Sequence, residues 1–145
     1  MQLKMKKIIF ILAMFQVISC TAQTDLKTEI TGNWEQEYYN DEGEAYYIGE
    51  IYTFHNDNTC TVVYSSDTKT KPALYHYEIV KDDCSNTPSQ EYFYLKMEGI
   101  SGDTFDNFCA KIDIFNENDD PNSSKKIMTL YHYGALSSNV FIKRP

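Results

Sequence analysis

The sequence predicts an all-β fold: an eight-stranded antiparallel up-and-down β-barrel with a short N-terminal helical segment. Beyond residue 30 the chain is rich in Tyr, Phe, Val, Ile and Thr, and turn-forming Asn, Asp, Gly and Ser recur at short intervals. No segment between these runs has the length and periodicity of a crossover helix, so successive strands must pair as antiparallel neighbours. Eight strands suffice to close such a barrel, and closure removes exposed sheet edges. A two-sheet sandwich has a similar number of strands and remains the alternative.

The first four strands are expected at residues 32–39, 46–54, 59–65 and 73–80. The first begins with Gly32-Asn33-Trp34, which holds the only Trp of the chain, and an Asn-Asp-Glu-Gly turn follows it. The second is rich in Tyr and Ile and ends at His55-Asn56-Asp57-Asn58, where Asn and Asp tolerate left-handed backbone. The third is short, and the fourth has an aromatic centre.

The last four strands are expected at residues 91–97, 109–115, 126–133 and 139–143. A polar loop at 81–90 precedes the fifth strand, and a loop containing Gly99 and Gly102 follows it. In the sixth, Ala110, Ile112 and Ile114 share one face. An acidic loop at 116–124 leads to the seventh strand, and a turn at 134–138 leads to the eighth. Residues 21–30 have weak helical periodicity.

Residues 1–20 have the composition of an export signal. A basic start at Lys4, Lys6 and Lys7 precedes an apolar run at 8–18 that is short for a transmembrane helix. The run ends Val17-Ile18-Ser19-Cys20, which resembles the lipobox of bacterial lipoproteins, and this resemblance implies a lipid on Cys20. The alternative is an ordinary secretory signal cleaved near residues 22–23. Either interpretation leaves 21–30 as a linker or helical turn and 31–145 as one domain.

The charge of the chain disfavours a nucleic-acid partner. Without residues 1–20, which carry three Lys and no acid, the chain has 10 Lys and Arg against 21 Asp and Glu, a net charge of −11. Binding to phosphates needs a cationic face, and none is visible. The acidic residues gather in loops, where solubility explains them.

Three cysteines remain after residue 20: Cys60, Cys84 and Cys109. An oxidising compartment favours one disulfide and one free thiol. Cys84 and Cys109 bracket one strand and a turn-rich stretch, and they are the preferred pair, with a stabilising contribution of about 3 kcal/mol. Cys60 lies inside a predicted strand and is interpreted as a small buried apolar residue.

The two ends of the predicted barrel resemble those of the lipocalin-like (calycin) family. In lipocalins a Gly-x-Trp begins the first strand, and a basic residue at the end of the barrel packs across that Trp. Gly32 and Trp34 match the first feature, and Arg144 matches the second. The resemblance implies a cation–π contact between Arg144 and Trp34 that closes the base of the barrel.

Internal segments extend this resemblance to the small lipocalin-like domains of bacterial exported proteins. They are the strand–turn–strand at 52–61 and the segment 94–96 followed by 109–112. The placement of Cys84 and Cys109 also resembles the disulfide of that group. The resemblance spans residues 30–144. The chain departs from secreted animal lipocalins in being shorter and in having no long helix beside the barrel, which bears on the family's usual large cavity.

Twelve tyrosines are the most unusual feature of the composition. Tyr suits strands that have one wet face. Alternatively, several Tyr line a cavity, as an apolar wall with hydroxyl groups for an amphipathic ligand. Aromatic residues lie on both faces of the predicted strands, so the inward-facing parity stays open. The candidate ligand-binding residues are Tyr46, Tyr52, Phe54, His76, Tyr94, Met128 and Leu130.

Nothing in the sequence positively supports catalysis, a metal or a cofactor. His55, His76 and His132 lack the paired spacing of a zinc site and are interpreted as structural or surface residues. The acidic stretch 116–120 lacks the Gly and the Glu that a calcium loop needs. No nucleophile motif and no phosphate-binding loop is present.

The sequence thus favours a lipid-anchored, exported barrel that binds a small hydrophobic or amphipathic molecule. Its expected location is the cell envelope, on the periplasmic side of the outer membrane. The alternative is a protein-binding envelope module, an inhibitor or accessory subunit, that acts through its loops without a ligand cavity. Acidic loops suit a basic protein partner in that case. An enzyme ranks last.

Overall fold

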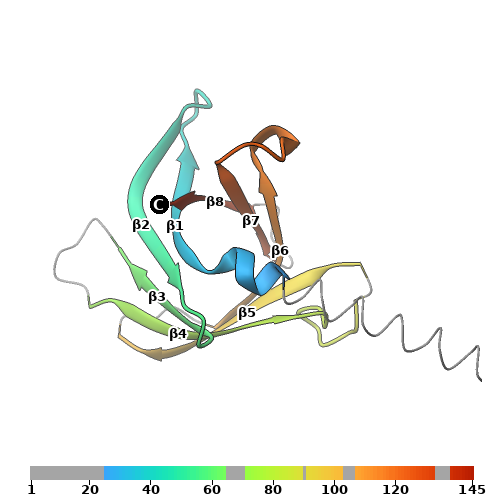
Figure 1. Ribbon diagram of the computed structural model, residues 1–145. Helices are drawn as coiled ribbons and strands as arrows, with labels where there is room; N and C mark the ends of the chain where they lie inside the picture. The colour runs from blue at the N-terminus through green and yellow to red at the C-terminus, as the bar shows by residue number, and fades with distance from the viewer. Residues whose placement is uncertain (1–24, 65–70, 90, 103–106, 133–137) are drawn as a thin grey trace, which may run out of the picture.

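The eight strands form one closed antiparallel barrel, drawn in Figure 1. The computed structural model describes residues 25–64, 71–89, 91–102, 107–132 and 138–145. Cys20 and the predicted export signal therefore lie outside the described residues. Within the described ranges, no helix combines the length and the apolar character needed to span a membrane.

The strands follow one another around the barrel in chain order, which confirms the predicted up-and-down topology. They are β1 (Gly32–Tyr39), β2 (Ala45–Phe54), β3 (Thr59–Val63), β4 (Ala73–Val80), β5 (Phe93–Ser101), β6 (Phe108–Asn116), β7 (Lys126–His132) and β8 (Ser138–Arg144). A short 3₁₀ turn, η1 (Glu117–Asp119), lies between β6 and β7. β5 extends past the predicted end because Gly99 and Ser101 pair with β4, so Gly99 belongs to a strand and not to a loop.

The first and last strands close the barrel by pairing with each other. Trp34 lies opposite Lys143 in the register of β1 with β8, and Glu37 lies opposite Val140. This pairing joins segments more than a hundred residues apart, and it leaves no free edge between the two ends of the sheet. The alternative of two separate packed sheets is therefore wrong.

Alternate residues of each strand point into the barrel, as the pleat of a β-strand requires. In β4 the inward residues are Tyr75 and Tyr77, and in β6 they are Ala110 and Ile112. The described core residues are Ile30, Trp34, Phe54, Cys60, Val62, Ala73, Tyr75, Tyr77, Ile79, Leu95, Met97, Ala110, Ile112, Met128, Leu130 and Phe141. They fill one end and the middle of the barrel.

A short helix at residues 25–30 lies across one end of the barrel, and Figure 1 shows it within the outline of the ring of strands. Its last residue, Ile30, is fully buried, and Leu26 packs against the same core. The indole Nε1 of Trp34 donates a 2.6 Å hydrogen bond to the carbonyl of Ile30. Lys126 Nζ also pairs with the Glu29 carboxylate at 2.9 Å. The helix therefore closes this end and is held there by side chains of the barrel.

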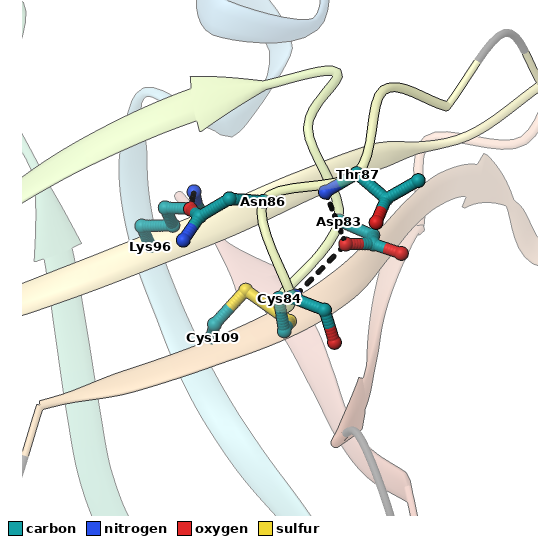
Figure 2. The surroundings of a disulfide bond; sticks show 7 residues. Asp83, Cys84, Asn86, Thr87, Lys96 and Cys109 are labelled. Atoms are coloured by element: carbon teal, nitrogen blue, oxygen red, sulfur yellow. Dashed lines mark hydrogen bonds between the residues drawn. A yellow bond between two sulfur atoms is a disulfide. The ribbon is translucent and has the colours of Figure 1, made fainter.

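The predicted disulfide between Cys84 and Cys109 is present, and Figure 2 shows its surroundings. It ties the loop at 81–89 to β6 on the outside of the barrel. The Asp83 carboxylate accepts hydrogen bonds from the backbone N–H groups of Ser85 and Thr87, both at 2.8 Å. Lys96 Nζ donates to the side-chain oxygen of Asn86 at 3.1 Å. Hydrogen bonds therefore hold the loop in addition to the disulfide.

Candidate ligand-binding cavity

A cavity of about 310 Å³ lies in the barrel, toward the end that the helix does not cover. Along β1 the order is Trp34, Gln36, Tyr38 away from the helix, and along β8 it is Lys143, Phe141, Asn139. The cavity begins above Trp34, at Gln36 and Phe141. Its described lining residues are Gln36, Tyr38, Glu50, Tyr52, Tyr75, Phe108, Leu130, His132, Asn139 and Phe141.

Aromatic and aliphatic side chains form the part of the cavity wall nearest Trp34. The ring of Tyr52 meets that of Phe141 edge-to-face, with centroids 5.0 Å apart. Leu130 is almost fully buried and lines the same cavity. Nearer the mouth, the Phe108 ring lies 5.5 Å from the imidazole of His132. These contacts hold the apolar surfaces in place before any ligand binds.

Three polar side chains of the cavity come from the neighbouring strands β1 and β2. The Tyr38 hydroxyl donates a 3.1 Å hydrogen bond to Glu50 Oε2. Burial, and then the negative charge of Glu50, raises the pKa of Tyr38 to about 12. Gln36 lines the cavity with only 6% of its surface exposed. An amide, a phenol and a carboxylate therefore lie together on this part of the wall.

The phenols deeper in the barrel stay protonated over the physiological range. Burial is the largest cause that raises the pKa of Tyr52, and the neighbouring Tyr64 and Glu50 add to it. Burial likewise raises the pKa of Tyr64, with Tyr75 and Glu50 contributing. These hydroxyls are neutral hydrogen-bonding groups and not anions.

β2 has a bulge next to Glu50. Glu35 of β1 pairs with Ile51 of β2, and Glu37 pairs with Tyr47. Two residues along β1 therefore correspond to four along β2. Gly49 lies in this irregular stretch with a φ of +74°, a backbone conformation that Gly adopts without steric cost. Glu50 then has the same parity as Tyr52, and both line the cavity.

The seven predicted ligand-binding residues divide into three groups. Tyr52 and Leu130 line the cavity. Phe54 and Met128 point inward and belong to the core, but they are not among the described residues that line the cavity. The others, Tyr46, His76 and Tyr94, do not line the cavity within the described chain.

Each of those three residues has a definite place in the structure. Tyr46 is exposed at the start of β2 and stacks on Tyr38 with centroids 5.8 Å apart. His76 has the parity opposite to the buried Tyr75 and Tyr77, so it lies on the outer face of β4. Tyr94 has the outward parity of β5 for the same reason, next to the buried Leu95. The prediction placed His76 and Tyr94 on the wrong face of their strands.

Reasoning from the sequence missed eight cavity residues: Gln36, Tyr38, Glu50, Tyr75, Phe108, His132, Asn139 and Phe141. A signal for three of them was present. If Trp34 points into the barrel, Gln36 and Tyr38 must do so as well, because they share its parity along the strand. Glu50 had the same kind of signal, because it shares the parity of Tyr52, which was predicted to line the cavity.

The cation that packs on Trp34 is Lys143, which corrects the role predicted for Arg144. Lys143 Nζ lies 5.2 Å from the centroid of the Trp34 ring and donates a 2.6 Å hydrogen bond to the carbonyl of Glu29. Arg144 lies opposite Asn33 in the register, on the other face of the sheet, and its Nε donates to Glu35 at 2.6 Å. The strand pairing was predicted correctly, but the basic residue was displaced by one position.

A second hollow lies outside the barrel, beside the disulfide loop of Figure 2. It is shallow and open, with a volume of about 620 Å³, and His76, Glu78 and Lys96 are among its lining residues. His76 pairs there with Glu78 at 3.5 Å. Most of its lining consists of polar and charged side chains of the outer sheet surface, so it lacks the apolar enclosure typical of small-molecule sites.

Cys60 is free and lies buried in the core. Burial raises the pKa of its thiol, so the reactive thiolate is disfavoured, and the interpretation as a small apolar residue agrees with this environment. No cluster of three or more His, Cys, Asp or Glu side chains suited to a metal ion occurs among the residues that the structure describes.

Comparison of the chain with protein-family models, with curated proteins and with solved structures gave no match. The barrel topology therefore stands on the structure alone. The resemblance to lipocalins remains a prediction that rests on the Gly32 and Trp34 motif and on the internal segments.

Proposed function

We propose that the protein is a lipid-anchored cell-envelope protein of lipocalin-like type, which binds a small hydrophobic or amphipathic molecule inside its barrel. The observation that carries this proposal is the internal cavity of about 310 Å³ between the Trp34 layer and the uncovered end. A barrel that served only as a scaffold gains stability by filling this space, because each void forfeits packing contacts.

The size of the cavity limits the ligand. Small-molecule pockets range over roughly 300–1,000 Å³, so this one suits a ligand at the lower end. A whole diacyl phospholipid does not fit, whereas a short-chain or single-ring amphiphile does. Five aromatic rings and one Leu supply apolar contact area, and Gln36, Glu50 and Asn139 supply polar partners. An amphipathic ligand satisfies both parts of the wall.

Support for an extracytoplasmic location comes from two sources. The segment ending at Cys20 has the residue order of a lipoprotein signal. The disulfide between Cys84 and Cys109 suits an oxidising compartment such as the periplasm. A lipid on Cys20 places the barrel at the membrane surface, where small amphiphiles concentrate. We place it on the periplasmic side of the outer membrane, as a binding protein and not as an enzyme.

The alternative function, a protein-binding module acting through its loops, expects a barrel interior filled by Tyr and Phe. Tyr77 and Phe54 do fill the end near the helix, with ring centroids 5.1 Å apart. The cavity at the other end is not filled, and this observation favours the ligand-binding function over the alternative.

Two Trp substitutions test the proposal. Asn139→Trp places an indole in the cavity. Val63→Trp adds the same ring at an exposed position of β3, away from the cavity. Binding of the neutral fluorescent probe N-phenyl-1-naphthylamine by the full chain is measured for both variants and for the wild type. We expect Asn139→Trp to weaken binding by about tenfold or more and Val63→Trp to leave it unchanged.

Circular dichroism melts serve as the folding control for both variants. If the wild type binds neither the probe nor any small molecule detectable by native mass spectrometry, the ligand-binding function is wrong. Equal loss of probe binding in the two folded variants contradicts the assignment of the site to the barrel interior.

A further inference from the structure

The charges around the cavity are one-sided. Among its described lining residues Glu50 is the carboxylate, and neither Lys nor Arg occurs. Lys143, which has the inward parity on β8, lies opposite Trp34, packs over its ring and donates to the carbonyl of Glu29, so it does not line the cavity. Among these lining residues an anionic ligand group therefore finds the imidazole of His132 but no Lys or Arg, whereas a positively charged group finds the Glu50 carboxylate.

Glu50 has capacity left for a ligand. Tyr38 occupies part of Oε2 through its 3.1 Å hydrogen bond, and an ionised carboxylate offers about four acceptor positions. The side chain is partly buried, so a hydrogen-bonded cation beside it gains more than it would at the open surface.

Aromatic side chains line the cavity together with Glu50. Tyr38, Tyr52 and Tyr75 come from three strands, and Phe108 and Phe141 complete the ring. The faces of such rings attract ammonium groups, by about 0.5–2 kcal/mol each depending on exposure. A carboxylate combined with several aromatic faces is a combination that binds amines and quaternary ammonium groups.

The effect of Glu50 on its neighbours points the same way. Its negative charge helps to raise the pKa of Tyr38, Tyr52 and Tyr64, because it opposes the formation of a phenolate near it. The same field opposes the carboxylate of a fatty acid in this space and favours a cation.

We propose that the cavity selects a cationic amphiphile: a small apolar body that carries an amine or a quaternary ammonium group, with the charge placed between Glu50 and the surrounding aromatic rings. This inference rests on the proposed function, that the barrel binds a small molecule, and adds the charge of the ligand. Fatty acids and other anionic amphiphiles are disfavoured by the same argument.

A matched series of three ligands tests the inference. Octyltrimethylammonium, octan-1-ol and octanoate share one alkyl chain and differ in charge. Their binding to the full chain is measured by isothermal titration calorimetry below their micelle-forming concentrations. We expect the cation to bind about tenfold more tightly than the alcohol, and octanoate to bind more weakly than the alcohol.

Two variants locate the effect. Glu50→Gln keeps an oxygen that accepts from Tyr38 and removes the charge, so cation binding is expected to fall to the level of the alcohol while alcohol binding stays constant. Glu78→Gln removes a carboxylate on the exposed outer face of β4 and is expected to change none of the three affinities.

Each outcome supports or overturns one claim. Equal binding of the three ligands to the wild type, or tighter binding of octanoate, overturns the charge inference while the ligand-binding function stands. The same is true if Glu50→Gln leaves the preference for the cation intact. Binding of none of the three, together with no binding of the neutral naphthylamine probe, overturns the proposed function itself. The wild-type series is informative even if Glu50→Gln fails to fold.

Discussion

At the scale of single residues, adjacent positions in a strand have unrelated roles because they face opposite sides of the sheet. Lys143 lies over the indole of Trp34 inside the barrel, and Arg144 pairs with Glu35 outside it. A prediction that is displaced by one residue therefore exchanges a core contact for a surface ion pair. The motif at Gly32 and Trp34 indicates that a basic residue meets the Trp, but it does not decide between two consecutive basic residues.

The first prediction compares Trp34 with Arg144. Trp34 is fully buried and its Nε1 binds the Ile30 carbonyl, so Trp34→Ala leaves a large cavity and an unpaired carbonyl. We expect a loss of about 3–5 kcal/mol in the free energy of unfolding. Arg144→Met breaks a partly exposed ion pair and is expected to cost less than about 1 kcal/mol. Urea unfolding followed by circular dichroism measures both. We assign the contact with Trp34 to Lys143. If the two variants lose a comparable amount of unfolding free energy, this assignment is wrong.

At the scale of elements, the strands could be predicted because each is bounded by turn residues. Asn58 has a φ of +66° in the turn between β2 and β3, as expected of Asn there. The inward face was predictable only where the two faces differ chemically. In β6, Ala110 and Ile112 alternate with Lys111 and Asp113, and the inward face is clear.

In β4 the two faces resemble each other, and the sequence does not decide between them. Tyr75 and Tyr77 point inward while Leu74 and His76 point outward, so both faces carry large residues. Tyr is compatible with either environment because its ring is apolar and its hydroxyl is polar. In β2, alternation from Tyr52 assigns Glu50 to the same face, although a bulge changes the register with β1 beside it.

The second prediction concerns the disulfide loop. Cys84 and Cys109 are 25 residues apart in sequence, and replacing both by Ala removes a cross-link worth about 3 kcal/mol in the chain-entropy model. The bond lies outside the barrel, and hydrogen bonds from Asp83 hold the loop without it. We therefore expect the double variant to fold, to unfold at lower urea concentration and to keep its affinity for the naphthylamine probe.

Urea unfolding and probe titration of the same samples measure these two effects. A loss of probe affinity in the folded double variant contradicts the placement of the binding site inside the barrel. An unchanged urea midpoint contradicts the stabilising role of the bond.

At the scale of the whole molecule, the two ends of the barrel differ in construction. One end is closed by the helix at 25–30, the indole of Trp34 and the bonds of Lys126 and Lys143 to Glu29. Toward the other end, the cavity places a carboxylate, amides and aromatic rings around unfilled space. Packing at the first end stabilises the fold, and the second end leaves unfilled the space in which we propose that a ligand binds.

This difference leads to the third prediction, that stability and binding change independently. Trp34→Phe retains a ring but loses the N–H bond to Ile30, so the free energy of unfolding should fall by about 1–3 kcal/mol. Its probe affinity should stay within about twofold of the wild type, because the cavity lies above this layer. Asn139→Trp should show the converse: weak probe binding and a change in unfolding free energy below about 1 kcal/mol, since Asn139 is only partly buried.

In the double variant the two effects on unfolding should add within about 0.5 kcal/mol, because the substitutions share no contact. Urea unfolding and probe titration of the four proteins provide the complete cycle. A coupling above about 1 kcal/mol means that the closed end and the cavity repack as one unit. In that case the cavity is a flexible region of a single core and not a preformed site. Additivity instead supports a rigid base that holds an open binding site.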